Sequence, residues 1–288
     1  MKVLIVGNGQ GSWTMRGKQL GERIGARVRT APTPDDWAWC EIIVLVKNWG
    51  ARFASEAERS GKPVVWDAVD FWRQPFDNGA DETRAKQLLQ NQLAVIRPTL
   101  TIGATQAMAA ACHGAYLPHH AWRGLVPTPP RDDEAKTIAY QGNPLYLGRW
   151  KAALEQACAS HRCRLVVDPT GDPDILWQAD VVVALRDREW DGWMPREWKS
   201  GVKIANAIAA GRPVLSQPTA AIRELRPVHV SIDEVPSAAV VEWALESLLA
   251  PDLRAWAYDV AQQSAPALRL PAVADRYVEI LAGLKVAS

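Results

Sequence analysis

Hydrophobic residues along the chain gather in short continuous runs, and the stretches between the runs place apolar residues at helical spacing. The runs predict strands over Val3–Gly7, Arg27–Thr30, Glu41–Val46, Pro63–Asp67, Leu100–Gly103, Ala115–Pro118, Thr137–Gln141, Arg164–Val167, Asp180–Leu185, Pro213–Ser216 and Val228–Ile232. The intervening periodicity predicts helices over Ser12–Ile24, Ala51–Ser60, Glu82–Ile96, Gln106–Cys112, Leu145–Ser160, Val202–Ala210, Ala238–Leu249, Asp252–Ser264 and Ala272–Leu284. Apolar strands that alternate with helices indicate an α/β protein whose parallel sheets are covered on both faces.

Residues 126–136 interrupt this alternation, with prolines followed by consecutive acidic residues. The strand and helix pattern then starts again, so we expect a linker at 126–136 between two doubly wound, Rossmann-like domains. The first covers residues 1–125 and the second residues 137–270. Ligands of such sheets bind beyond the carboxyl ends of the strands, here in the cleft between the domains.

Composition and charge exclude several classes of protein. The 288 residues carry 33 basic and 32 acidic side chains, a net charge of +1, so overall charge does not indicate a nucleic-acid-binding polycation. None of the four cysteines forms a CxxC pair, which favours free thiols in a reducing compartment. No apolar run is long enough for a transmembrane helix, and the first strand is too short for a signal peptide. We therefore expect a cytoplasmic protein, most simply a monomer.

A glycine-rich loop, Gly7-Asn-Gly9-Gln-Gly11, follows the first predicted strand. Glycines in this place let the backbone approach a ligand and open a helix whose N–H groups favour anions. The spacing is GxGxG rather than GxGxxG, and no acidic residue ends the second strand at Val28–Pro32, so a dinucleotide site is disfavoured. We expect Gly9 and Gly11 to face the interdomain cleft and to contact a different phosphate-bearing ligand.

The segment from Trp198 to Ser216 carries the most specific pattern in the chain. Ser200-Gly201 begins a helix and presents free N–H groups suited to a diphosphate, and Lys203 adds a positive charge one turn later. The helix ends in Ala209-Ala-Gly211-Arg-Pro213-Val and runs into a strand. This arrangement resembles the donor-site motif of GT-B glycosyltransferases. Many retaining members have Glu-x7-Glu here, and this chain has Trp198 and Asn206 in those positions.

The resemblance implies a metal-independent glycosyltransferase that holds a nucleotide-sugar donor, most simply a UDP-sugar, in its C-terminal domain without a tightly bound cofactor. It also implies that a final helix, residues 271–288, packs back on the N-terminal domain. The side chains and turns expected to contact the donor are Gly9, Gly11, Gly142, Arg186, Ser200, Gly201, Lys203, Asn206 and Glu224. Asn206 or Glu224 would contact the ribose, and Arg186 the diphosphate.

Two carboxylates follow the fourth predicted strand, in Val64-Val-Trp66-Asp67-Ala-Val-Asp70. An inverting transferase needs one carboxylate as a general base on the acceptor hydroxyl. Asp70 is the first candidate and Asp67 the second, and His119 and His120 are rival bases. A retaining mechanism needs no such base, so the stereochemistry stays open. No His, Cys, Asp or Glu cluster has metal-ligand spacing.

Tryptophan is unusually abundant, with 14 residues against 3 Phe and 5 Tyr. A flat indole face stacks well on sugars and bases. The predicted elements place Trp49, Trp66, Trp72 and Trp122 at or near strand ends, and Trp190, Trp193 and Trp198 in the loop before the helix at Val202–Ala210. We therefore predict an aromatic acceptor groove that includes Trp13, Trp49, Trp72 and His119. Two acceptors fit this expectation, a glycan and a hydroxymethylated DNA base of the kind that phage glucosyltransferases modify.

Two other functions stay open from the sequence. A nucleotide-sugar 2-epimerase would use the same scaffold but needs several acid and base residues around the sugar. A non-catalytic two-domain module would bind the nucleotide sugar without transferring it. In each case closure of the domains about the linker would bring the two halves together.

Overall fold

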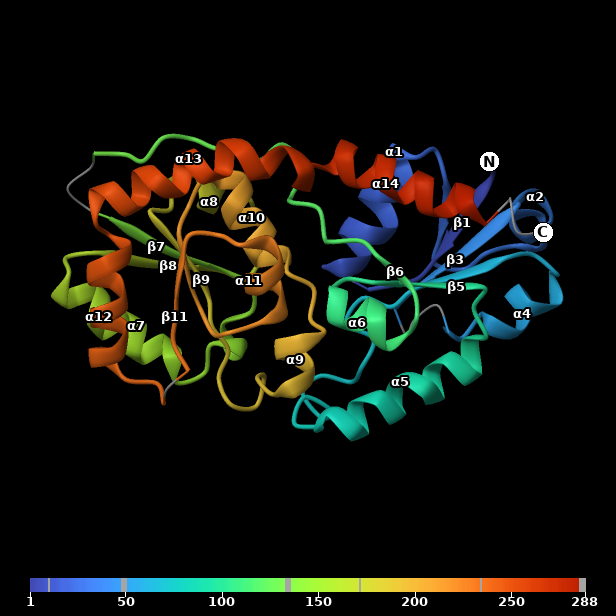
Figure 1. Ribbon diagram of the computed structural model, residues 1–288, viewed down its shortest axis with the longest axis horizontal. Helices are drawn as coiled ribbons and strands as arrows, with labels where there is room; N and C mark the ends of the chain where they lie inside the picture. The colour runs from blue at the N-terminus through green and yellow to red at the C-terminus, as the bar shows by residue number, and fades with distance from the viewer. Residues whose placement is uncertain (10, 48–50, 133–135, 171, 234, 285–288) are drawn as a thin grey trace.

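The computed structural model describes residues 1–9, 11–47, 51–132, 136–170, 172–233 and 235–284. Two parallel sheets lie side by side along its long axis (Figure 1). The N-terminal sheet has six strands in the order β2-β1-β3-β4-β5-β6. Their bounds are β1 Val3–Val6, β2 Arg27–Arg29, β3 Ile42–Val46, β4 Val64–Asp67, β5 Leu100–Gly103 and β6 Ala115–Tyr116.

The C-terminal sheet has five strands in the order β11-β10-β9-β7-β8. Their bounds are β7 Thr137–Gln141, β8 Arg164–Asp168, β9 Val181–Ala184, β10 Val214–Ser216 and β11 His229–Ser231. Every pairing in both sheets is parallel. The predicted α/β class with two doubly wound sheets is confirmed.

Helices cover both faces of each sheet. In the N-terminal half they are the π-helix η1 Trp13–Gln19, α1 Leu20–Arg23, α2 Pro34–Trp39, α4 Ala54–Arg59, α5 Glu82–Ile96 and α6 Gln106–Ala111. In the C-terminal half they are the short 3-10 helix η2 Pro144–Tyr146, α7 Trp150–Ser160, α8 Asp174–Gln178, α9 Trp193–Glu197, α10 Val202–Ala210, α11 Ala220–Leu225, α12 Ala238–Leu248, α13 Pro251–Leu268 and α14 Leu270–Gly283. None of the described helices is long and apolar enough to span a membrane.

The π-helix η1 forms around the indole of Trp13. This ring is only 3% exposed, because it lies against Gly7 at the end of β1 and Gly17 in the same helix. A Cβ atom at Gly17 would lie 2.1 Å from the Trp13 ring and one at Gly7 would lie 2.6 Å from it, so both positions require glycine. The predicted acceptor role of Trp13 is therefore wrong in this structure: the side chain is a core residue.

One aromatic cluster belongs to both halves of the chain. Trp198 and Met194, from the segment around α9, are buried in the same core cluster as Trp66 and Phe71 of the N-terminal half. The ring centroids of Phe71 and Trp198 are 6.1 Å apart. The Asn78 amide donates to the Glu189 carbonyl oxygen at 3.1 Å. The two halves therefore share an apolar interface in this region.

The chain crosses between the two halves twice, and the crossings lie next to each other. The first crossing is the segment after β6, and the second is the junction of α13 and α14, where the Ala121 N–H donates to the Leu268 carbonyl oxygen at 2.8 Å. Helix α14 then runs along the N-terminal half (Figure 1). Its residues Leu270, Val273 and Tyr277 belong to the core cluster that contains β1.

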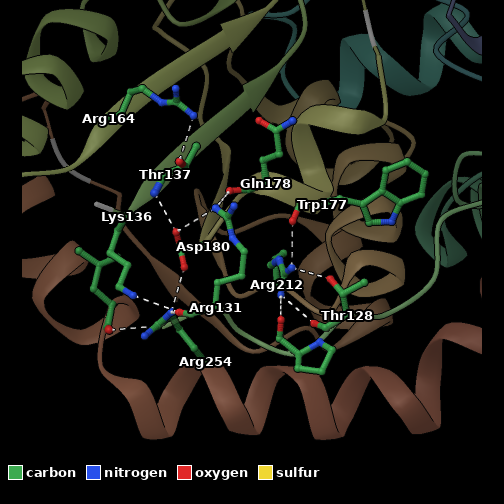
Figure 2. Close-up of polar contacts among 12 residues, drawn as sticks. Thr128, Arg131, Lys136, Thr137, Arg164, Trp177, Gln178, Asp180, Arg212 and Arg254 are labelled. Carbon is green, nitrogen blue, oxygen red and sulfur yellow. Dashed lines mark hydrogen bonds and ion pairs between the residues drawn. The ribbon is translucent and has the colours of Figure 1, made fainter. Parts of the chain in front are cut away.

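The linker is held to the C-terminal half by a buried arginine (Figure 2). The Arg212 guanidinium, at the end of α10, donates to the carbonyl oxygen and the hydroxyl of Thr128 and to the Trp177 carbonyl oxygen, at 2.8, 2.6 and 3.2 Å. These contacts fix the path of residues 126–131 along the C-terminal half.

Candidate functional site

Positive side chains from both halves gather at the carboxyl ends of the two sheets. Arg186 follows β9, Lys199 precedes α10, and Lys203 lies in the first turn of α10. Lys47 reaches the same region from the end of β3 in the N-terminal half, where its charge acts on Asp70 and Lys199. We call these four residues the cation cluster.

Two members of the cation cluster have no counter-ion. Among the residues that the structure describes, the side chains of Arg186 and Lys203 form no hydrogen bond or ion pair, although the Lys203 Nζ lies 3.6 Å from the centre of the Tyr140 ring. Burial lowers the pKa of Lys203 well below its usual value, and the charges of Arg186 and Lys199 lower it further. Burial also lowers the pKa of Arg186. An anion between Arg186 and Lys203 would offset the unfavourable burial of both positive charges.

Gly142 leaves room for such an anion. It follows β7 with φ 138°, a backbone conformation that side chains disfavour, and a Cβ atom there would lie 3.3 Å from the Lys203 Nζ. The structure therefore brings together three of the predicted donor residues, Gly142, Arg186 and Lys203.

The start of α10 is contacted by a carboxylate from the other half. The Ser200 N–H donates to the Asp70 Oδ1 at 3.0 Å, and the Ser200 hydroxyl lies 3.4 Å from Oδ2. The Lys199 Nζ is 3.6 Å from the same Oδ2 and donates to the Gln74 Oε1 at 2.8 Å. Gly201 is the N-cap of α10, with no side-chain cap. Asp70 thus occupies the anion-binding end of the helix.

The environment of Asp70 changes what it can do chemically. Burial alone would raise the pKa of its carboxyl group, but Lys199, Lys47 and the Ser200 amide together hold that pKa below its usual value. Its backbone is in the left-handed region with φ 44°, a conformation that costs energy for a residue with a side chain and is typical of functional sites. Bound in this way, Asp70 is a weak base.

Asp67, the second candidate base, lies away from the cation cluster. It is fully buried, and its nearest cation is the Arg16 Nε of the π-helix at 3.4 Å. Burial raises the pKa of Asp67. In this structure a base role for Asp67 is not supported, because the strand directs this side chain toward η1 and α14 rather than toward α10.

His119 is the stronger of the two histidine candidates. It is 1% exposed, and neither ring nitrogen has a hydrogen-bond partner among the described residues. Burial, followed by the charges of Arg16 and His120, lowers the pKa of His119 well below its usual value, while the charge of Asp70 opposes that shift. His119 is therefore neutral at pH 7 and lies within electrostatic reach of Asp70. The Nε2 atom of His120 is 3.1 Å from the Gln19 Oε1 and so has a partner.

Asn206 and Glu224, the predicted ribose contacts, hold the protein together instead. The Asn206 amide donates to the Gln141 Oε1 and accepts from the Trp122 N–H, both at 2.8 Å, and the residue is 2% exposed. The Glu224 Oε1 accepts from the Gln106 N–H at 2.7 Å, at the start of α6 in the N-terminal half. Burial raises the pKa of Glu224. Both side chains are held by these contacts and are not available to a ligand at the cation cluster.

The other predicted positions divide into two groups. Gly9 and Gly11 are exposed in the loop after β1, with φ 105° and 57°, which leaves their predicted ligand contact open. Trp72 is 4% exposed and donates to the Asn78 Oδ1 at 2.8 Å, so it is a core residue rather than part of a groove. Trp49 lies outside the described residues.

Lys47 and Tyr140 are the site residues that the sequence analysis missed. Lys47 directly follows the most apolar strand of the N-terminal half, and a cation at the end of a parallel strand is the signal that would have found it. Tyr140 lies inside a buried strand, and only the folded structure shows the Lys203 ammonium over its ring.

No protein-family model matches the chain, and no curated protein matches it. The Anabaena protein HepE, solved with UDP and glucose, matches with a TM-score of 0.67 over 98% of this chain and 100% of its own, at 13% identity. AviGT4, a glycosyltransferase involved in avilamycin A biosynthesis, matches with a TM-score of 0.58 over 100% of this chain and 99% of its own, at 14% identity.

The α,α-trehalose 6-phosphate synthase of Burkholderia multivorans matches with a TM-score of 0.58 over 96% of this chain and 80% of its own, at 11% identity. The chain has the GT-B fold. The cation cluster of this GT-B chain lies where its two sheets meet at their carboxyl ends, which is the ligand-binding edge of such sheets.

Proposed function

We propose that this GT-B chain is a glycosyltransferase that takes a sugar from a nucleoside diphosphate sugar. The observation that carries the proposal is a pair of partly buried cations next to the start of α10, Arg186 and Lys203, whose side chains have no ion pair with any residue that the structure describes. Two positive groups and free helix N–H groups are the donors that a diphosphate requires. The neighbour HepE was solved with UDP and with UDP-glucose, which makes a UDP-sugar the first donor to test.

The cation cluster would stabilise the leaving diphosphate. When the bond between the sugar and the diphosphate breaks, negative charge develops on the diphosphate oxygens. Arg186 and Lys203 are already in place before the reaction, so their charges act without reorganisation. Burial of the two cations is unfavourable because it removes part of their hydration. A bound diphosphate would supply favourable interactions that water no longer provides.

The contact between Asp70 and α10 suggests how a base becomes available. A donor phosphate would compete with the Asp70 carboxylate for the Ser200 N–H and the Lys199 ammonium. Displaced from them, Asp70 loses the interactions that lower its pKa and becomes a better proton acceptor for an attacking hydroxyl group. His119, with both ring nitrogens unpartnered, is the alternative acceptor of this proton.

For the acceptor, we favour a glycan over a hydroxymethylated DNA base. The DNA hypothesis depended on Trp side chains lining the cleft, and Trp13 and Trp72 are 3% and 4% exposed. The net charge of +1 also gives no overall attraction to the phosphates of a duplex. A glycan hydroxyl requires neither feature.

The proposal is tested by a thermal-shift panel of UDP-, GDP-, ADP- and CMP-sugars. A ligand at 100 times its Kd stabilises the folded state by about 2.7 kcal/mol, so one member of the panel is expected to raise Tm by about 5 °C or more. Incubation of that donor with a mixture of glycans is expected to release free nucleoside diphosphate and a glycosylated product. A melt that none of the donors shifts contradicts the proposal. An isomerised sugar in place of a transfer product identifies an epimerase, and binding without turnover identifies a binding module.

Affinity for the donor is expected to fall as the pH rises above about 8. Burial lowers the pKa of Lys199 to about 8, although Asp70 opposes that shift. A bound diphosphate favours the charged ammonium, so binding takes up a proton above this pKa and weakens by up to about tenfold per pH unit. The measurement is the Kd of the UDP-sugar between pH 7 and pH 9. Lys199→Arg is the control, because arginine stays charged and its profile should be less steep, with Lys203 still able to lose its proton; an equally steep profile in that variant contradicts the assignment.

A further inference from the structure

A cavity of about 710 Å³ lies where the chain crosses between the two halves. Three segments line it: the end of η1 with α1, the first crossing at residues 121–126, and the junction of α13 and α14 at residues 269–271. None of the four residues of the cation cluster lines this cavity. Its volume is within the range of small-molecule sites, roughly 300–1,000 Å³. We call it the hinge cavity.

The lining of the hinge cavity carries an excess of positive charge on exposed side chains. Each of the three segments contributes one arginine to the lining: Arg23, Arg123 and Arg269. Within the described part of the chain, none of these three guanidinium groups has a hydrogen bond or ion pair. The lining contains one acidic residue, Glu22. Trp122, Leu125 and Leu270 provide an apolar surface beside the charges.

We propose that the hinge cavity binds a phosphate-bearing small molecule, a nucleotide or another polyphosphate, that bridges the three arginines. A guanidinium group binds phosphate oxygens in pairs, and three of them on one cavity, from separate segments, match a ligand with more than one phosphate. The apolar side chains suit a base or another organic group attached to the phosphates.

A ligand in this place would hold both crossings at once. Arg123 lies on the first crossing and Arg269 on the second, and a hydrogen bond from Ala121 to Leu268 already joins the two. A bridge between these arginines and Arg23 of the N-terminal half would therefore restrain rotation between the halves.

The hinge cavity is also connected to the cation cluster through one helix. The Trp122 N–H donates to the Asn206 Oδ1 at 2.8 Å, and Asn206 lies one turn after Lys203 in α10. A ligand against Trp122 is therefore expected to change donor affinity, and the donor to change the affinity of the hinge ligand by the same factor. This coupling rests on the proposed function, whereas binding in the hinge cavity does not.

The test is calorimetric titration of the full chain with inorganic tripolyphosphate, which can occupy the hinge cavity and the cation cluster. The wild type is expected to show two classes of site. Arg123→Gln/Arg269→Gln is expected to weaken one class at least tenfold and leave the other unchanged. Lys203→Met is expected to weaken the class of site that the double arginine variant leaves unchanged, and to keep the other class. The matched control is Arg84→Gln/Arg162→Gln, which removes two exposed arginines elsewhere, and it should keep both classes.

Hydrogen exchange of the wild-type protein locates the bound anion without any substitution. Tripolyphosphate is expected to slow exchange in residues 121–126 and 268–272, also in the presence of saturating UDP. A single class of site that is lost in Lys203→Met overturns the proposal, as does equal weakening by the hinge and control variants. Unchanged exchange at both crossings overturns it as well. If the protein binds tripolyphosphate in the hinge cavity but does not bind UDP, the proposed function is contradicted and the hinge site is still supported.

Discussion

Lys203→Met is expected to weaken binding of the nucleoside diphosphate sugar by about 10- to 100-fold while it raises the stability of the free protein by about 1 kcal/mol. The ammonium is largely buried beside Arg186 and Lys199, both of the same sign, and has no counter-ion among the described residues. Methionine keeps the length of the side chain and packs against the Tyr140 ring, which lies 3.6 Å from the present Nζ. The substitution thus removes a buried charge that destabilises the free protein. It also removes the attraction between that charge and the diphosphate of the bound donor.

The measurements are Tm without ligand and Kd for the donor found in the panel. Lys151→Met is the matched control, because Lys151 is an exposed lysine of α7 whose contact is an ion pair with Glu155 at 3.3 Å. This control should change neither quantity appreciably. If Lys203→Met lowers Tm, or leaves donor affinity intact, the lysine is a structural residue and the proposed site loses its main support.

Asp180→Asn is expected to destabilise the folded protein by about 3–5 kcal/mol. The Asp180 Oδ1 lies 2.9 Å from the Arg254 Nη1, and the side chains of both residues are at most 5% exposed. The second oxygen accepts from the Thr137 N–H at 2.8 Å and lies 3.9 Å from the Arg131 Nη2 (Figure 2). Without the carboxylate, Arg254 keeps its charge in a buried position.

Urea unfolding measures this effect, and two further variants test its cause. Asp77→Asn removes a carboxylate whose partner Arg73 is 75% exposed, so its cost should stay under about 1 kcal/mol. Asp180→Asn/Arg254→Met removes both buried charges and should recover part of the stability that the single change loses. Equal costs for Asp77→Asn and Asp180→Asn would show that the buried pair contributes no more than a surface pair.

The strands were predictable because a buried parallel strand is a continuous apolar run. Each predicted run overlaps an observed strand, from Val3–Val6 to His229–Ser231, although β8 extends one residue beyond its predicted run, to Asp168. The short helices α2, α8, α9 and α11 were not predicted, since five or six residues give little helical periodicity, and the starts of α2 and α11 depend on the caps Thr33 and Thr219. Capping residues in a single turn are a weak signal in the sequence.

The candidate site was predictable where it depends on strand ends and helix starts. Gly142, Arg186 and Lys203 come together because parallel strands deliver their following residues to one edge. Asn206 was misplaced because the pattern does not show that the Trp122 N–H lies beside it. The burial of Trp72 was missed because it depends on α9 lying against the N-terminal half, and that of Trp13 because it depends on the π-helix closing its ring against Gly7 and Gly17.

The shared aromatic cluster also determines how this chain can be recombined with others. An exchange of C-terminal halves at the linker would separate Trp198 from Phe71 and Trp66, and the incoming half would have to supply a matching surface. Helix α14 would arrive with the C-terminal half although its apolar face packs on the N-terminal core. A working chimera therefore needs four matched pieces: the two sheets, the segment around α9 and the final helix. The design of a hybrid enzyme therefore has to preserve these contacts between the halves, which an exchange of one continuous sequence segment at the linker would break.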